Sequence, residues 1–146
     1  MRLTRSAKVV AATLAITAGG VAAAVVPGSP AVAFQSGPLF LDVQVESGTL
    51  VARGAAVDVV VDVTCTSPEA FVDISLTQRV GSAIASGFGS TTVGCTGGSQ
   101  RVVVTVTAFG EKAFRKQPAV ATATVSGSLG GVFGSENDTE TIGLQR

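Results

Sequence analysis

This chain of 146 residues carries ten Lys or Arg and ten Asp or Glu, and it contains no His, Trp or Tyr. The absence of His excludes a Ser-His-Asp triad, a Cys-His pair and a His-ligated zinc or iron site. The balanced charge argues against a nucleic-acid-binding surface, which needs an excess of Lys and Arg.

The first 33 residues have the pattern of a signal peptide. Three basic residues precede a nearly uncharged run of Ala, Val, Leu, Ile, Thr and Gly, and Ala31-Val32-Ala33 then supplies a small-residue cleavage site. We therefore expect a secreted, extracellular chain of residues 34–146 with no membrane span after cleavage. An uncleaved transmembrane anchor is the alternative. The expected mature chain keeps seven of the ten basic residues and all ten acidic ones, so it is mildly acidic.

The only two cysteines are Cys65 and Cys95. In an exported chain of this size they are expected to form one disulfide, with two free thiols as the alternative. Closing a loop of about 30 residues is worth roughly 3.5 kcal/mol in the chain-entropy model.

Alternating apolar and polar residues predict about seven short strands. The pattern is clearest at 57–65, where Val57, Val59, Val61, Val63 and Cys65 share one face of an extended chain. Further strands are expected, in chain order, at 39–46, 49–52, 70–80, 83–93, 101–108 and 119–126, where 49–52 is either a short strand or a continuation of the one before it. No segment has the apolar spacing of a helix over three turns.

Two segments give weaker signals. Residues 83–93 are rich in Gly and Ser, and we expect an irregular edge strand there, anchored by Ile84 and Phe88. Residues 127–146 are Gly-rich and then acidic, which predicts a frayed tail with at most one last strand at 141–144. The whole pattern indicates an all-β, antiparallel two-sheet sandwich of about seven strands. It would form one domain at 34–146, with its core at about 39–126.

Some strand sequences resemble known domains. Val61-Asp62-Val63-Thr64-Cys65 resembles the second strand of immunoglobulin-like domains, although the chain has no Trp to pack on the disulfide and no Tyr for a tyrosine corner. Together with Leu76-Thr77-Gln78-Arg79 and Val104-Thr105-Val106-Thr107, it resembles small secreted actinobacterial immunoglobulin-like β-sandwich domains of unknown function. That resemblance covers about residues 39–125, implies a sandwich, and brings no activity and no functional residues with it.

The stretch from 109 to 116 is the candidate binding loop. It combines three cations, Lys112, Arg115 and Lys116, with Phe109 and Phe114, between two well-patterned strands. Loops on a rigid β scaffold commonly carry binding groups, so this loop is expected to recognise an acidic or glycan partner at the cell envelope. The alternative is that both Phe side chains cap the core while the cations stay solvated.

Carboxylates offer one further possibility for chemistry. Asp58 and Asp62 share a strand face but lie roughly 13–14 Å apart at about 3.4 Å per residue. Glycosidase carboxylates must lie about 5–9.5 Å apart. With Asp73 from another strand they would form a Ca²⁺ site, but a solvated polar face is the favoured interpretation. We therefore expect no metal, no cofactor and no catalytic residues.

These observations favour an exported, non-enzymatic binding or cell-envelope-associated module, with an envelope component or a small ligand as partner. The alternative function is a small-ligand carrier, which would resemble the secreted enediyne-carrying apoproteins in architecture alone. An enzyme would have to work with carboxylates and lysines. A structural role through an exposed sheet edge also stays open.

Overall fold

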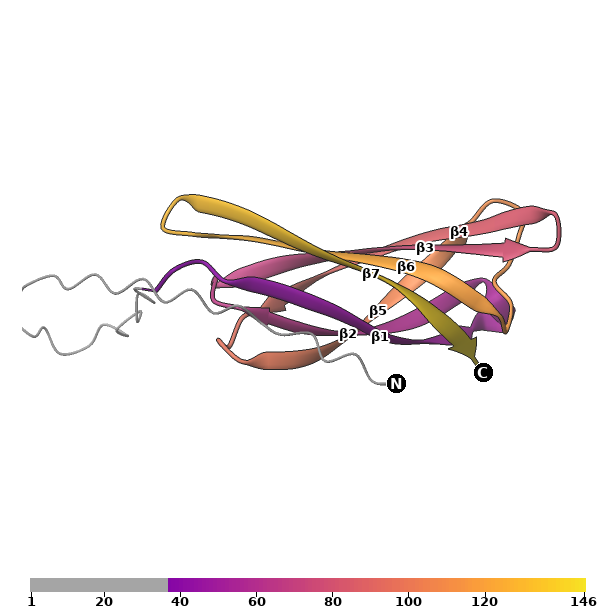
Figure 1. Ribbon diagram of the computed structural model, residues 1–146, viewed down its shortest axis with the longest axis horizontal. Coiled ribbons are helices and arrows are strands. Elements are labelled where there is room, and N and C mark those ends of the chain that lie inside the picture. Colours follow the sequence, from indigo (N-terminus) through magenta and orange to yellow (C-terminus); the bar gives the residue numbers. More distant parts are fainter. Residues whose placement is uncertain (1–36) are drawn as a thin grey trace, which may run out of the picture. The chain divides into compact units, whose positions relative to one another are not determined.

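The computed structural model describes residues 37–146, which form a closed barrel of seven strands (Figure 1). The elements are β1 (Leu41–Val51), η1 (Ala52–Gly54), β2 (Ala56–Cys65), β3 (Glu69–Val80), β4 (Ala83–Gly94), β5 (Ser99–Phe109), β6 (Pro118–Leu129) and β7 (Val132–Gln145). Around the barrel the order is β1-β2-β5-β4-β3-β6-β7. None of the helical turns from residue 37 onward is long and apolar enough to cross a membrane. The expected signal peptide lies outside the described residues.

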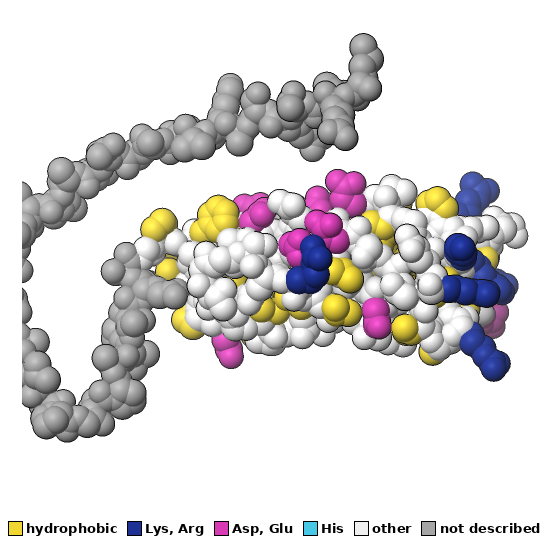
Figure 2. All heavy atoms as spheres, turned by 90° about the horizontal axis from the view of Figure 1, so that it is seen from below, with side chains coloured by type: hydrophobic (Ala, Val, Ile, Leu, Met, Phe, Trp, Pro, Cys, Tyr) yellow, Lys and Arg dark blue, Asp and Glu magenta, His cyan; other side chains and the backbone are white. Residues whose placement is uncertain are grey.

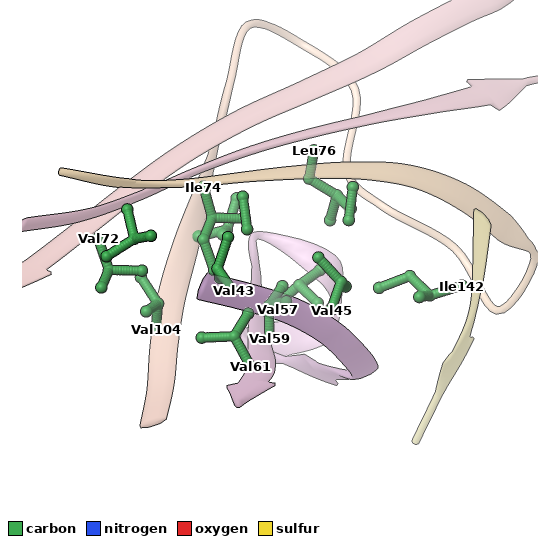
Figure 3. Close-up of a cluster of buried hydrophobic side chains, with 14 of the residues drawn as sticks. Val43, Val45, Val57, Val59, Val61, Val72, Ile74, Leu76, Val104 and Ile142 are labelled. Carbon is green, nitrogen blue, oxygen red and sulfur yellow. The ribbon is translucent and has the colours of Figure 1, made fainter. Parts of the chain in front are cut away.

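β2 confirms the clearest strand prediction. Its inward residues, the four Val and Cys65, are fully buried, while the residues between them are partly exposed. β3 and β6 show the same alternation, and Val72, Ile74 and Leu76 of β3 point into the interior toward the side chains of β1, β2 and β5 (Figure 3). Burying one such side chain contributes about 1.5–3 kcal/mol, so alternation is enough to decide which face of β2, β3 and β6 turns inward.

The barrel corrects the predicted antiparallel, immunoglobulin-like sandwich. β4 pairs with β3 along its whole length and also with β5, through Ser86, Gly87 and Phe88. β7 pairs with β6 and, in parallel, with β1 at Gly48 and Thr49. These two short seams join the strands into one closed, mixed sheet. The all-β class and the number of about seven strands are confirmed, and the sandwich was wrong. The segments 39–46 and 49–52 form one strand, β1, and most of β7 lies in the segment predicted as a tail.

Glycine lets both seams close. A Cβ on Gly87 would lie 2.7 Å from the carbonyl oxygen of Thr107, and a Cβ on Gly89 would overlap the carbonyl group of Thr105. At the other seam, a Cβ on Gly48 would lie 2.7 Å from Cδ2 of Leu144. Strands at a barrel corner approach this closely only where no side chain separates them.

β4 is therefore not the edge strand that its Gly- and Ser-rich sequence predicted. Its inward positions are Ala85, Gly87 and Gly89, whereas the predicted anchors point outward: Ile84 is 69% exposed and Phe88 is 50% exposed. The prediction assigned the large side chains to the core. At this corner the backbone of β5 occupies that space instead.

The predicted tail is also replaced by regular structure. β6 continues to Leu129, and β7 returns through a turn at Gly130 and Gly131, whose φ angles of 59° and 83° suit a tight hairpin. Ile142 and Leu144 of β7 are buried. Only its end, at 141–144, was expected to form a strand, because acidic residues at 136, 138 and 140 stand where an inward face would need apolar ones. One of them, Asp138, accepts a hydrogen bond from the backbone N–H of Val45 at 2.9 Å.

The predicted disulfide is confirmed. Cys65 and Cys95 are bonded, with their Cα atoms 5.2 Å apart, and the bond joins the end of β2 to the β4–β5 connection. The backbone N–H of Cys95 also donates to the carbonyl oxygen of Pro68. The disulfide holds the end of the barrel at which β4 and β5 are not paired, and it is consistent with an oxidising compartment.

Candidate binding site at the basic end of the barrel

Charge is distributed unevenly along the barrel. At one end β1, β3, β5 and β7 finish and β2, β4 and β6 begin, and this end holds six of the seven Lys and Arg residues found between 37 and 146. They are Arg53, Arg79, Lys112, Arg115, Lys116 and Arg146. Only one of the ten acidic residues, Glu111, lies among them. Figure 2 shows Lys and Arg gathered at this end and Asp and Glu over the middle of the barrel. We call this region the basic end.

The predicted binding loop lies within the basic end, where it connects β5 to β6. Lys112, Arg115 and Lys116 are all exposed. The two Phe residues differ, because Phe114 is 1% exposed and closes the interior while Phe109 is 60% exposed. The alternative interpretation, in which both Phe side chains cap the core, is therefore correct for Phe114 and wrong for Phe109. Recognition by this loop stays a prediction.

A buried glutamine holds the loop in place. The side-chain Nε2 of Gln78, on β3, donates to the carbonyl oxygens of Arg115 and Gln117, each at 2.9 Å. Its Oε1 accepts from the backbone N–H of Arg115 at 2.7 Å. Gln78 is 2% exposed, so these bonds are shielded from water. Gln78 was not predicted as part of the site, although a polar residue at an inward position of a strand was a signal for it.

A tight turn brings a further cation to the loop. In η1, Ala52, Arg53 and Gly54 have φ angles of 47°, 59° and 89°, and a left-handed conformation costs on the order of 1 kcal/mol for a residue other than Gly. The carbonyl oxygen of Gly54 accepts from the backbone N–H of Phe114 at 2.8 Å. A side chain at Gly54 would overlap the carbonyl oxygen of Phe114. The turn therefore fixes Arg53 beside the loop.

Four cations surround one surface depression of about 510 Å³. Arg53, Arg115, Lys116 and Arg146 line it, together with Leu50 and Phe114. The end of β7 is tied to the loop by a hydrogen bond from the N–H of Leu144 to the carbonyl oxygen of Gln117. The volume lies within the range of about 300–1,000 Å³ typical of ligand sites. We call this the basic depression.

The carboxylates considered in the sequence have other partners. Asp62 forms a two-pronged ion pair with Arg101, with both N–O distances 2.9 Å, and Asp58 accepts from the hydroxyl of Thr105 at 2.7 Å. Asp73 lies on β3, which pairs with β4 and β6 and not with β2. Between residues 37 and 146, no three His, Cys, Asp or Glu side chains are grouped so that they could hold a metal ion.

The ion pair predicts a pH effect. The hydrogen bond from Arg101 holds the pKa of Asp62 below its ordinary value. A carboxyl whose pKa is lowered by folding stabilises the fold above its unfolded pKa, and loses that contribution as pH falls through the folded pKa. In Arg101→Gln we expect the pKa of Asp62 to rise toward its ordinary value, measured by NMR titration of the carboxyl carbon. If Asp62 gave the same titration curve in both proteins, Arg101 would not be the cause of its lowered pKa.

No protein-family model matches this chain, and no curated protein matches it at a significant level. Its function therefore has to be inferred from the basic end itself. The arrangement there can hold an anionic group against several cations on a fixed backbone.

Proposed function

We propose that this chain is an exported, non-enzymatic binding module whose basic end engages an anionic polymer of the cell envelope. The observation that carries the proposal is the concentration of six cations at one end of the barrel, with nine of the ten acidic residues elsewhere. Such a field attracts a polyanion to one end and repels it from the rest of the surface, which speeds and orients the encounter.

Export is supported by the signal-peptide pattern at 1–33 and by the disulfide, which needs an oxidising compartment. A non-enzymatic role is supported by the absence of His and by the pairing of Asp58 and Asp62 with neighbouring side chains. We also propose, on the strand sequences quoted above, that the chain is related to small secreted actinobacterial domains of unknown function. The immunoglobulin-like sandwich that this resemblance implied is excluded by the closed barrel.

The test removes the three loop cations together, as Lys112→Gln, Arg115→Gln and Lys116→Gln in one variant. Binding of fluorescently labelled polyphosphate and sedimentation with isolated bacterial cell walls are measured at low and high salt. We expect the wild-type protein to bind at low salt and the variant to bind about tenfold more weakly. Three exposed ionic contacts of about 0.5 kcal/mol each predict that loss.

Arg101→Gln serves as the control, because it removes a cation that lies outside the basic end and should leave binding nearly unchanged. If the wild-type protein fails to bind either probe at low salt, or if the triple variant binds as well as it does, the proposal is wrong.

The small-ligand carrier makes a different prediction. Inward side chains from all seven strands fill the barrel interior, so a carried ligand would occupy a surface depression. A native mass spectrum of the secreted protein would then contain a ligand mass that disappears on denaturation. A bare mature protein would leave the polymer-binding function in place and remove the carrier.

A further inference from the structure

The six cations of the basic end are not equivalent. Arg53, Arg115, Lys116 and Arg146 converge on the basic depression, although they come from three segments far apart in the sequence. Arg79 and Lys112 belong to the same end but do not line the depression. A surface that attracts polyanions only through its net charge does not require its cations to line one depression, so this grouping points to a more specific site.

The backbone beneath the four cations is held firmly. Gln78 binds both sides of the Arg115–Gln117 segment, and Phe114 anchors that segment in the core. The Gly54 carbonyl holds the Arg53 turn against Phe114. Folding therefore orders most of the backbone that a ligand would otherwise have to order on binding, which favours affinity for a small group.

The chemistry of the cations favours one kind of anion. Three guanidinium groups from three separate segments line the depression, each a planar donor of up to five N–H groups, and the Lys116 ammonium adds a point charge. A carboxylate has two oxygens, and a single two-pronged Arg contact occupies both of them. A phosphate group has more oxygens in a tetrahedral arrangement, and a monoester carries about 1.5 to 2 negative charges at pH 7.

We infer that the basic depression is a discrete phosphate site, which takes the phosphate group of a phosphate ester or phosphodiester. This inference rests on the proposed function, because it names the group that the anionic polymer presents. A phospholipid headgroup or a free phosphate ester would present the same chemistry, and the experiment separates these sources.

Two variants with matched loss of charge test the inference. The depression variant is Arg53→Asn with Arg115→Gln, and Asn is chosen because it tolerates the left-handed conformation. The outer variant is Arg79→Gln with Lys112→Gln, which removes two cations from the same end. Thermal unfolding first establishes that both variants are folded. Affinity for polyphosphate and for inorganic phosphate is then measured, the latter by NMR titration against acetate at equal ionic strength.

We expect inorganic phosphate to shift the amide signals of 53–54 and 114–117 saturably, and acetate to shift them much less. The depression variant should lose about fivefold more affinity than the outer variant, because only the cations that line the depression can donate charge-assisted hydrogen bonds to a group bound in it. Equal losses in the two variants, or equal binding of acetate and phosphate, would overturn the inference while polymer binding survives. If the wild-type protein did not bind the polymer at all, the proposed function would be overturned as well.

The source of the phosphate follows from two further probes. Vesicles of phosphatidylglycerol, with phosphatidylcholine vesicles as the reference, present the group on a lipid surface, whereas polyphosphate presents it in solution. Phosphate-dependent binding to either probe supports the site and identifies its source. If the wild-type protein binds neither phosphatidylglycerol vesicles nor polyphosphate, the phosphate site is contradicted.

Discussion

Replacing both Cys65 and Cys95 with Ala is expected to lower the free energy of unfolding by about 3.5 kcal/mol at 25 °C. The bond closes a loop of 30 residues and so restricts the unfolded chain. It also holds the end of the barrel at which β4 and β5 have separated, so its loss frees the β4–β5 connection in the folded state as well. Since domains are typically stable by about 5–15 kcal/mol, the variant should be folded but fragile. Urea unfolding followed by circular dichroism measures the change.

Wild-type protein in a reducing agent is the control for the disulfide, and its unfolding midpoint should match that of the Cys65→Ala, Cys95→Ala variant. Polyphosphate binding should survive at temperatures where the variant is folded, because the bond and the basic end lie at opposite ends of the strands. A loss of stability below about 1 kcal/mol, the size of an ordinary substitution, would contradict the structural role given to the bond.

Gly89→Ala is expected to lower the free energy of unfolding by about 3 kcal/mol, at the upper end of the effects of overpacking. The new Cβ would overlap the Thr105 carbonyl group and lie 3.1 Å from the Cα of Val106. These are backbone atoms, so no side-chain rotation can relieve the contact. The β4–β5 seam would have to separate, and it consists of only three residue pairs. Thermal unfolding and hydrogen exchange of the 105–107 amides measure the effect.

Gly94→Ala is the matched control, because Gly94 ends the same strand and a Cβ there would meet no atom within 4 Å. We expect a change within about 0.5 kcal/mol for this substitution. If Gly89→Ala proved as harmless as Gly94→Ala, β4 and β5 would not be in contact in solution. The closed barrel would then be the wrong description of the fold.

The same two strands show how far local sequence can predict structure. In β2 every second residue is a Val or Cys, and burial of that face leaves one orientation and one register. In β4 the large side chains Ile84 and Phe88 stand on one face and Ala85, Gly87 and Gly89 on the other, so local sequence favours burial of the wrong face. Which face of β4 turns inward depends on how closely β5 approaches, and the residues of β5 that pair with β4 lie 19 to 23 positions further along the chain.

The candidate site divides in the same way. Lys112, Arg115 and Lys116 could be predicted because they stand together in one unusual loop. Arg53 and Arg146 could not, because each is a single cation in an unremarkable segment. They reach the basic depression only after the barrel has brought the ends of β1, β5 and β7 together.

The sequence by itself determined the all-β class, the positions of most strands, the disulfide and the cations of the binding loop. Each of these depends on neighbouring residues or on the chemistry of one residue type. Tertiary structure alone decided that the strands close into a barrel, that β4 and β7 complete it, and that four cations share one depression. These features depend on contacts between residues far apart in the chain, where the space left by Gly48, Gly87 and Gly89 decides which strands can meet.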